Sequence, residues 1–166
     1  VNRGKGAAIR TGIERIRTLE GVDAVIMLDA DGQHDPHEIP RFAEEFVKGD
    51  TDLIIGNRMG NRGAMPPVRS FTNRFTSAII SARAGQSVPD TQNGYRLARA
   101  SLLARLHLTS SRYEIDSETI IKACRRAGAR VSSIPVRTIY GTEKSAINPL
   151  RDGLRFLALV IRSLFW

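Results

Sequence analysis

A short apolar segment that runs directly into acidic residues constrains this sequence more than any other feature. Residues 25–28 read Val-Ile-Met-Leu, and Asp29, Asp31 and Asp35 follow, with Gly32 among them. A charge beside a buried strand costs free energy unless another group compensates it. In an open α/β sheet, ligands bind beyond the carboxyl ends of the strands. The segment therefore predicts a central, buried strand whose end forms a binding site.

Apolar spacing predicts that helices and strands alternate around this segment. Helices are predicted at residues 3–19, 36–48, 71–79 and 114–126, and strands at residues 24–28, 52–55 and 131–139. Residues 92–97 fit either a strand or a turn, and the glycines and prolines of residues 56–67 indicate a loop. This order predicts an α/β fold with a mostly parallel central sheet covered by helices.

Two details refine this fold prediction. The sequence begins with a predicted helix, whereas a sheet of this kind normally starts from a strand. We therefore expect that an N-terminal strand–helix–strand unit is missing and that the fold is N-terminally truncated. Pro135 lies in the last extended segment and has no N–H to donate, so that segment is expected at an edge or a bulge.

The charge and composition narrow the classes of partner. A net charge of +8 favours phosphorylated ligands, anionic lipid headgroups or nucleic acid. The basic residues are scattered and only 6% of residues are aromatic, which disfavours a nucleic-acid-binding surface. The single cysteine, Cys124, excludes an internal disulfide framework. No apolar run approaches the ~20 residues of a spanning helix.

Asp29 and Asp31 are candidate metal ligands. Two carboxylates at the end of one strand can converge on a cation, and oxygen ligands suit Mg²⁺ or Mn²⁺. Gln33 can add a carbonyl oxygen, and His34 is a further candidate. A divalent ion held here would bridge the phosphates of a nucleotide and neutralise charge on a leaving group.

The acidic segment also allows other interpretations. Asp and Gly are common in turns, so residues 29–35 could be a turn alone. An EF-hand is excluded because Gly32 falls at the fourth position and Pro40 at the twelfth. Residues 29–32 also resemble the Asp-x-Asp-Gly motif of haloacid dehalogenase-type phosphatases, but Gln33 replaces the hydroxyl residue that follows there. That alternative stays open.

Five segments together resemble the dolichyl-phosphate mannose synthase branch of the family-2 inverting glycosyltransferases. They are residues 2–6 (NRGKG), 29–36 (DADGQHDP), 55–58 (IGNR), 90–96 (DTQNGYR) and 113–118 (YEIDSE). The resemblance implies a GT-A type, Rossmann-like fold that binds a nucleotide-diphospho-sugar. It also implies a hexosyltransferase that moves the sugar, with inversion and metal assistance, to a polyprenyl (dolichyl or undecaprenyl) phosphate. The family's first strand has no counterpart here, which supports truncation.

The resemblance also assigns roles to individual residues. It implies metal ligation by Asp29, Asp31 and Gln33, and donor binding by Gly4, Lys5, Asp29 and Arg58. It implies catalytic roles for Asp31, Arg58, Asp90 and Glu118. Glu118 would be the general base if the acceptor is a hydroxyl, and Asp116 belongs to the same acidic motif. It implies an acceptor-phosphate site at Arg137, Tyr140, Lys144 and Ser145.

The C-terminal residues predict an amphipathic basic helix. Its apolar face would carry Leu150, Leu154, Leu157, Ile161 and Leu164, and its basic face would carry Arg151, Arg155 and Arg162. Such a helix can lie in a membrane interface, although a helix docked on the core has the same pattern. We therefore divide the chain into a partial catalytic domain, 1–146, and a C-terminal helix, 147–166.

The sequence thus predicts a glycosyltransferase at the cytoplasmic face of the membrane, acting in the cell envelope. The expected partners are a nucleotide-diphosphate sugar, a polyprenyl phosphate lipid, the membrane surface and Mg²⁺ or Mn²⁺, without nucleic acid. A non-catalytic, basic nucleic-acid-binding module is the competing hypothesis from another class. Metal-dependent binding of a nucleotide sugar separates the two.

Overall fold

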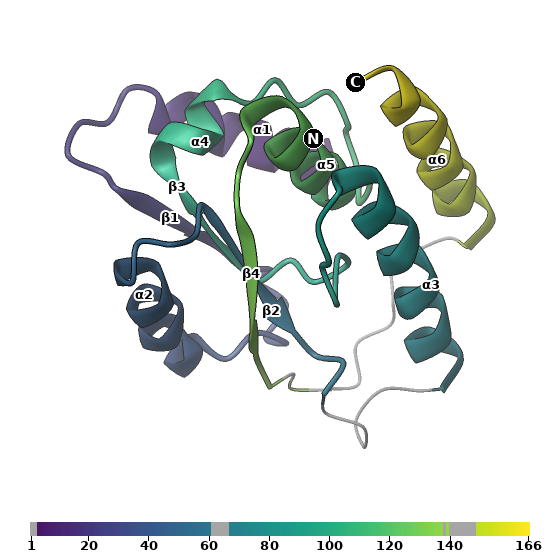
Figure 1. The fold of residues 1–166 in the computed structure, drawn as a ribbon, viewed down its shortest axis with the longest axis horizontal. Helices are drawn as coiled ribbons and strands as arrows, with labels where there is room; N and C mark the ends of the chain where they lie inside the picture. Colours follow the sequence, from purple (N-terminus) through teal and green to yellow (C-terminus); the bar gives the residue numbers. More distant parts are fainter. Residues whose placement is uncertain (1–2, 61–66, 138, 140–148) are drawn as a thin grey trace.

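The computed structural model describes residues 3–60, 67–137, 139 and 149–166 (Figure 1). The predicted acceptor-site residues Tyr140, Lys144 and Ser145 lie outside these ranges. The elements in chain order are α1 (Lys5–Ile16), β1 (Ala24–Met27), η1 (Pro36–Glu38), α2 (Ile39–Val47), β2 (Leu53–Asn57), α3 (Pro67–Ala84), β3 (Arg96–Arg99), α4 (Ala100–Arg105), α5 (Ile115–Ala127), β4 (Val131–Pro135), α6 (Pro149–Arg162) and η2 (Ser163–Phe165).

The four strands form one mixed sheet in the order β1-β3-β2-β4. β3 is antiparallel to both β1 and β2, and only β2 and β4 pair in parallel. The expectation of a mostly parallel sheet is therefore wrong for the pairing, although β1, β2 and β4 share one direction. After α3 the chain returns to the end of the sheet where β2 finishes, and β3 must then run backwards (Figure 1).

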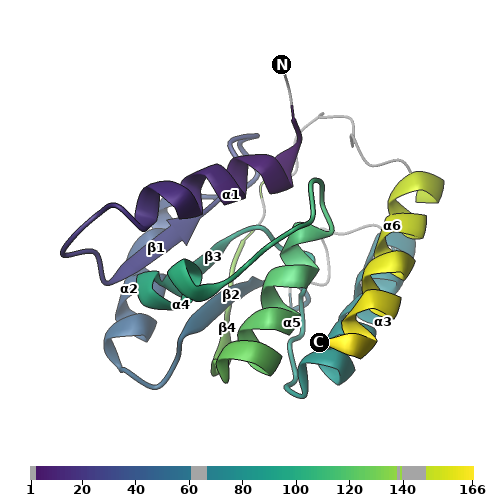
Figure 2. The ribbon, with the colours of Figure 1, turned by 90° about the horizontal axis from the view of Figure 1, so that it is seen from above.

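Helices cover both faces of the sheet (Figures 1 and 2). On one face, α2 packs Phe42 against Ile54 and Leu97. On the other face, Leu53 and Ile55 join a larger apolar cluster with residues of α1, α3, α4 and α5. Side chains alternate across a strand, so the continuous apolar run Leu53–Ile54–Ile55 serves two cores at once.

The edges of the sheet agree only in part with the prediction. β4 lies at one edge, as Pro135 predicted. β1 lies at the other edge of the described sheet, and its four residues are half-buried. The expectation of a central, fully buried strand before Asp29 is therefore wrong for the described residues.

The local predictions around β2 and η1 have clear physical causes. Asp35 caps η1 by accepting from the His37 N–H at 3.0 Å, and Pro36 follows at the first helical position, as predicted. β2 continues through Gly56, which the sequence assigned to a loop. A Cβ at Gly56 would lie 2.8 Å from Asn93 Nδ2 and 2.9 Å from Val136 Cγ2, so the strand needs glycine there.

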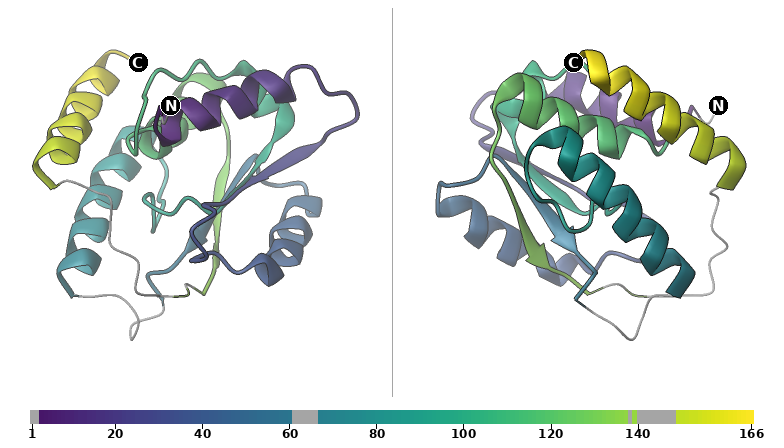
Figure 3. Two further views of the ribbon diagram at one scale, coloured as in Figure 1. Left: turned by 180° about the vertical axis from the view of Figure 1, so that it is seen from behind. Right: turned by 45° about the vertical axis from the view of Figure 1, so that its right-hand side comes forward.

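Helices α3 and α6 are neighbours (Figures 2 and 3), and Arg83 of α3 bonds to Ser163, directly after α6. Both helices carry exposed apolar side chains. The predicted α3 face carrying Phe71 and Phe75 points outward, with 73% and 60% exposure. The face of α3 that turns inward instead carries Asn73, Ser77 and Ile80. Leu159 of α6 is buried, while four of its predicted apolar residues are exposed, namely Leu154, Leu157, Ile161 and Leu164.

No helix in the described part of the chain combines the length and the apolar composition that crossing a membrane requires.

Candidate active site

The reversed strand β3 gathers the predicted motifs at one end of the sheet. Arg96 pairs with Met27 of β1 and with Ile55 of β2, so the start of β3 lies where those two strands finish. Residues 90–95 therefore lie beside both Asp29 and Arg58. A parallel β3 would have placed residues 90–95 at the opposite end.

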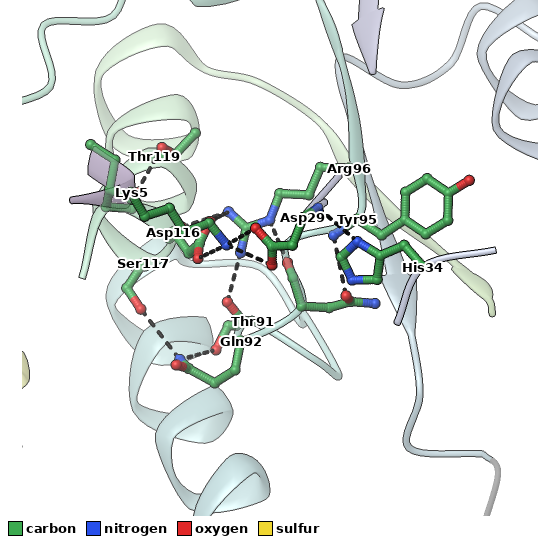
Figure 4. Close-up of polar contacts among 12 residues, drawn as sticks. Lys5, Asp29, His34, Thr91, Gln92, Tyr95, Arg96, Asp116, Ser117 and Thr119 are labelled. Atoms are coloured by element: carbon green, nitrogen blue, oxygen red, sulfur yellow. Dashed lines mark hydrogen bonds and ion pairs between the residues drawn. The ribbon is translucent and has the colours of Figure 1, made fainter. Parts of the chain in front are cut away.

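Lys5 occupies the middle of the gathered residues (Figure 4). Its Nζ lies 3.0 Å from Asp29 Oδ1 and 2.9 Å from Asp116 Oδ2. Burial alone would lower the pKa of Lys5, but the charges of Asp116 and Asp29 outweigh it and raise that pKa above its ordinary value. The predicted donor-binding lysine therefore bonds to carboxylates, and it stays protonated.

Asp116 points into this cluster and is held there from the opposite side by Arg96. The buried Arg96 Nη1 donates to the Asp116 carbonyl at 2.7 Å and lies 3.7 Å from Asp116 Oδ1. Arg96 also donates to the carbonyls of Asn93 and Thr91. The sequence analysis placed Asp116 in the same acidic motif as Glu118 and Arg96 in the segment at 90–96, but it named neither among the catalytic or binding residues. One sequence signal could have identified Arg96: it directly precedes the apolar pair Leu97–Ala98, and a charge buried at that position needs partners.

Glu118 lies outside the cluster. Residues two apart on a helix do not face each other, so Asp116 and Glu118 at the start of α5 point in different directions. Glu118 is fully buried, and it accepts from the Thr109 N–H at 3.0 Å, the Ser110 N–H at 2.8 Å and Lys122 Nζ at 2.6 Å. This geometry makes Glu118 the anchor of the loop at 109–110, and its role as general base stays a prediction.

Replacing Glu118 with glutamine is expected to lower the free energy of unfolding by about 3 kcal/mol. The change removes the charge that pairs with Lys122 and replaces one of the two oxygens that accept from the Thr109 and Ser110 N–H groups. Burial raises the pKa of Glu118, but hydrogen bonds from Lys122, Ser110 and Thr109 lower it overall. The stabilisation is therefore present above pH 4.5, the ordinary glutamate value, and is lost as pH falls through the lowered folded pKa. Chemical unfolding of both proteins between pH 3 and pH 7 measures this effect. Unchanged unfolding together with lost sugar transfer would instead support the general-base prediction.

The glycines around Lys5 serve close packing. The Gly6 N–H donates to the Ser111 carbonyl at 3.0 Å, and a Cβ on Gly6 would collide with the backbone of Ser110 and Ser111. Gly4 adopts φ +91°, a conformation that favours glycine. A Cβ there would lie 2.6 Å from the Ser111 carbonyl oxygen. The start of α1 is thus pressed against the loop that Glu118 anchors, which is a different role from the predicted donor contact at Gly4.

Arg58 and Asp90, both predicted catalytic residues, form a buried ion pair. Arg58 Nε lies 2.7 Å from Asp90 Oδ2, and Arg58 Nη2 lies 2.9 Å from Asp90 Oδ1. The Arg58 N–H also donates to Asp90 Oδ2 at 3.1 Å. The structure therefore brings these two residues together. The guanidinium of Arg58 faces Asp90, whereas the sequence predicted that it would bind a donor phosphate.

The segment after β1 presents its two aspartates differently. Asp29 faces Lys5, whereas Asp31 is exposed and accepts from the Gln33 N–H at 3.1 Å, which closes a local turn. The turn and the ligand interpretations of this segment are thus compatible. The Gln33 carbonyl accepts from the Ile139 N–H at 3.1 Å, so the segment that follows β4 lies beside it. The predicted acceptor residue Arg137 is exposed nearby, and its N–H lies 3.4 Å from Glu38 Oε1.

His34 supports the backbone of this segment. Its Nδ1 accepts from the Asp29 N–H at 3.0 Å, and its ring stacks on Tyr95 with centroids 4.9 Å apart (Figure 4). Burial lowers the pKa of His34, more than the neighbouring Asp29 and Asp31 raise it. The ring is therefore neutral near pH 7 and positions Asp29. The Asp29 N–H already uses the Nδ1 lone pair that a metal would need.

Comparison with known protein families identifies the family of this chain. Residues 1–106 match the sequence model of the family described as glycosyl transferase family 2. The chain belongs to glycosyl transferase family 2. The matched range includes the segment after β1, the Arg58–Asp90 pair and Arg96, and it ends before Asp116.

Several proteins of this kind are similar to the chain. It is 32% identical over 144 residues to UDP-N-acetylglucosamine–dolichyl-phosphate N-acetylglucosaminyltransferase of Methanococcus voltae, covering 84% of the chain and 57% of that protein. It is 30% identical over 136 residues to undecaprenyl-phosphate mannosyltransferase of Micrococcus luteus, covering 78% and 53%. The chain thus spans little more than half of these relatives.

Solved structures show the fold that the sequence predicted. Glucosyl-3-phosphoglycerate synthase from Mycobacterium tuberculosis, in complex with phosphoglyceric acid, matches with a TM-score of 0.70 and 20% identity. The match covers 98% of this chain and 56% of that one. The family-2 chain described here therefore has the GT-A fold, with four strands in the described sheet.

The residues of this family-2 chain fit a divalent ion carried by a ligand. Among the described residues, no group of three or more His, Cys, Asp or Glu side chains could hold a metal by itself. An ion that bridges a nucleotide diphosphate needs only one or two protein carboxylates, since phosphate oxygens and waters complete its shell. Asp31 at the surface, with Asp29 beside it, provides that number.

Proposed function

We propose that the protein transfers a sugar from a nucleotide-diphosphate donor to a polyprenyl phosphate. The observation that carries the proposal is the convergence of Lys5, Asp29, Asp116 and Arg96 at one end of a family-2 sheet, with the exposed Asp31 two residues after Asp29. Relatives named for dolichyl- and undecaprenyl-phosphate acceptors support the acceptor class. Matching structures of glucosyl-3-phosphoglycerate synthase, crystallised with Mn²⁺ and uridine-diphosphate, support the donor class.

The proposed cofactor is Mg²⁺ or Mn²⁺, with Asp31 and Asp29 as carboxylate ligands and Gln33 as a further oxygen donor. When bound, the ion would neutralise the diphosphate that leaves. Lys5 and Arg96 balance the charges of Asp29 and Asp116, which reduces the repulsion that an anionic donor would meet at this end of the sheet.

The proposed reaction is a single in-line displacement. An oxygen of the acceptor phosphate forms a bond to the anomeric carbon while the bond from that carbon to the diphosphate breaks, so the configuration inverts and a nucleoside diphosphate leaves. A phosphate oxygen is already ionised and needs no strong general base. The buried position of Glu118 is compatible with such an acceptor.

A lipid acceptor requires access to a membrane, which we propose is the cytoplasmic face. Both α6 and the neighbouring α3 (Figure 3) carry exposed apolar residues, Phe71 and Phe75 of α3 among them, and exposed apolar residues suit a lipid interface. Arg69 and Arg74 of α3 are exposed on the same helix and suit anionic headgroups.

The test is a panel of nucleotide sugars assayed on the protein at its full natural length, with polyprenyl phosphate in vesicles and Mn²⁺. Transfer of one sugar to the lipid is expected, together with its loss in chelator. Hydrolysis of a phosphate ester without transfer would support the phosphatase alternative, in which Asp29 is the nucleophile. Metal-independent, salt-sensitive binding of an oligonucleotide would contradict the transferase proposal.

A further inference from the structure

The Lys5 ammonium lies where two carboxylates from distant parts of the chain meet. Asp29 follows β1 and Asp116 lies in the first turn of α5, and Nζ is within 3.1 Å of oxygens from both side chains. Asp116 is 6% exposed, so its charge is largely removed from water. Two carboxylates that share one small site repel each other unless a cation lies between them.

The backbone around Lys5 fixes the ammonium in this place. Close packing at Gly4 and Gly6 presses the start of α1 against residues 110–111, and Glu118 anchors the same loop from α5. Asp116 lies on the same first turn of α5 as Glu118. One loop therefore sets the distance between the lysine and the acid that it contacts.

The space around the ammonium is full on a third side. A Cβ on Gly94 would lie 2.6 Å from Lys5 Nζ and 2.5 Å from Asp29 Oδ2. Because residue 94 is a glycine, the Lys5 ammonium and the Asp29 carboxylate can both lie directly against the backbone there. Arg96 donates to the Asp116 carbonyl and so helps to fix the acid that the ammonium contacts.

We propose that Lys5 is a positioning residue, whose ammonium acts as a tethered cation that joins Asp29 to Asp116 and excludes a metal ion from the space between them. A divalent ion between the two carboxylates would meet the ammonium at contact distance, so repulsion and lack of room both oppose it. The ion carried by a donor is thereby directed to the exposed Asp31 side. Only this last consequence rests on the proposed function.

The test measures Mn²⁺ binding without any nucleotide, by electron paramagnetic resonance of the ion that stays free. Lys5→Met keeps most of the side-chain length and removes the charge. We expect Lys5→Met to bind Mn²⁺ at least tenfold more tightly than the unmodified protein, because the two carboxylates then lack the cation that lies between them. The double variant Lys5→Met with Asp116→Asn should return to the weak binding of the unmodified protein.

Lys48→Met is the matched control, since it removes an exposed lysine that pairs with Glu45 on α2. It should leave Mn²⁺ binding unchanged. Circular dichroism selects the variants that fold, and Lys5→Gln, a smaller neutral side chain, replaces Lys5→Met if the latter does not fold. Equal Mn²⁺ binding by a folded Lys5 variant and the unmodified protein would overturn the proposal. These measurements involve no sugar transfer, so failure of the proposed function would show separately in the transfer assay.

Discussion

Replacing Asp90 with asparagine is expected to lower the free energy of unfolding by about 3 to 5 kcal/mol, the range for removing one partner of a buried ion pair. Asp90 is fully buried and Arg58 is 8% exposed. Asparagine keeps the shape of the side chain but presents an N–H₂ group to a guanidinium that has only donors. The buried charge of Arg58 would then lose the carboxylate that it faces.

Thermal unfolding and urea titration of the purified chain measure this effect, and a decrease of roughly 10 °C in midpoint is expected. Glu14→Gln is the matched control because Glu14 forms an ion pair with Arg17 at 2.6 Å but is largely exposed. It should leave the free energy of unfolding within about 0.5 kcal/mol of the unmodified value. If the Asp90 variant is equally stable, the pair is not a structural contact and the predicted phosphate role of Arg58 becomes the better interpretation.

The sequence predicted the elements well because each has a local cause. The apolar spacing of Ile9, Ile13 and Ile16 predicted α1, the Asp35–Pro36 pair predicted the start of η1, and Pro135 predicted an edge strand. The direction of β3 could not be predicted in this way. It depends on the path of residues 85–95 back across the molecule, and no local pattern in residues 92–97 specifies a strand's direction.

The site residues show the same limit. Aspartates at the end of β1 were predictable because charge after an apolar run is unusual. Asp116 and Glu118 could not be separated from sequence alone, since both are acids in the first turn of one helix. Only the packing of that helix determines which one faces the start of β3. Phe71 and Phe75 show the same limit, because their spacing predicts an amphipathic helix but not which face of that helix packs on the core.

Replacing Asp31 with asparagine is expected to reduce sugar transfer by about a thousandfold in the protein at its full natural length. Bound metal ions stabilise developing charge on phosphate oxygens by several kcal/mol, and about 4 kcal/mol corresponds to that factor. Asparagine keeps the oxygen that accepts from the Gln33 N–H, so the turn at residues 31–33 should persist. Asp31 is exposed, so the stability of the fold should change little.

Initial rates at several Mn²⁺ concentrations, with one donor and polyprenyl phosphate, measure the loss. The matched control is Asp50→Asn. Asp50 is an exposed aspartate that follows α2, and it lies 3.8 Å from the Arg130 guanidinium. That variant should keep its activity and its dependence on Mn²⁺. A thousandfold loss that excess Mn²⁺ partly reverses fits weakened metal binding, whereas an Asp31 variant that keeps a third of its activity would contradict the metal site at the end of β1. A loss with altered thermal unfolding would instead indicate that the turn, rather than the ligand, was changed.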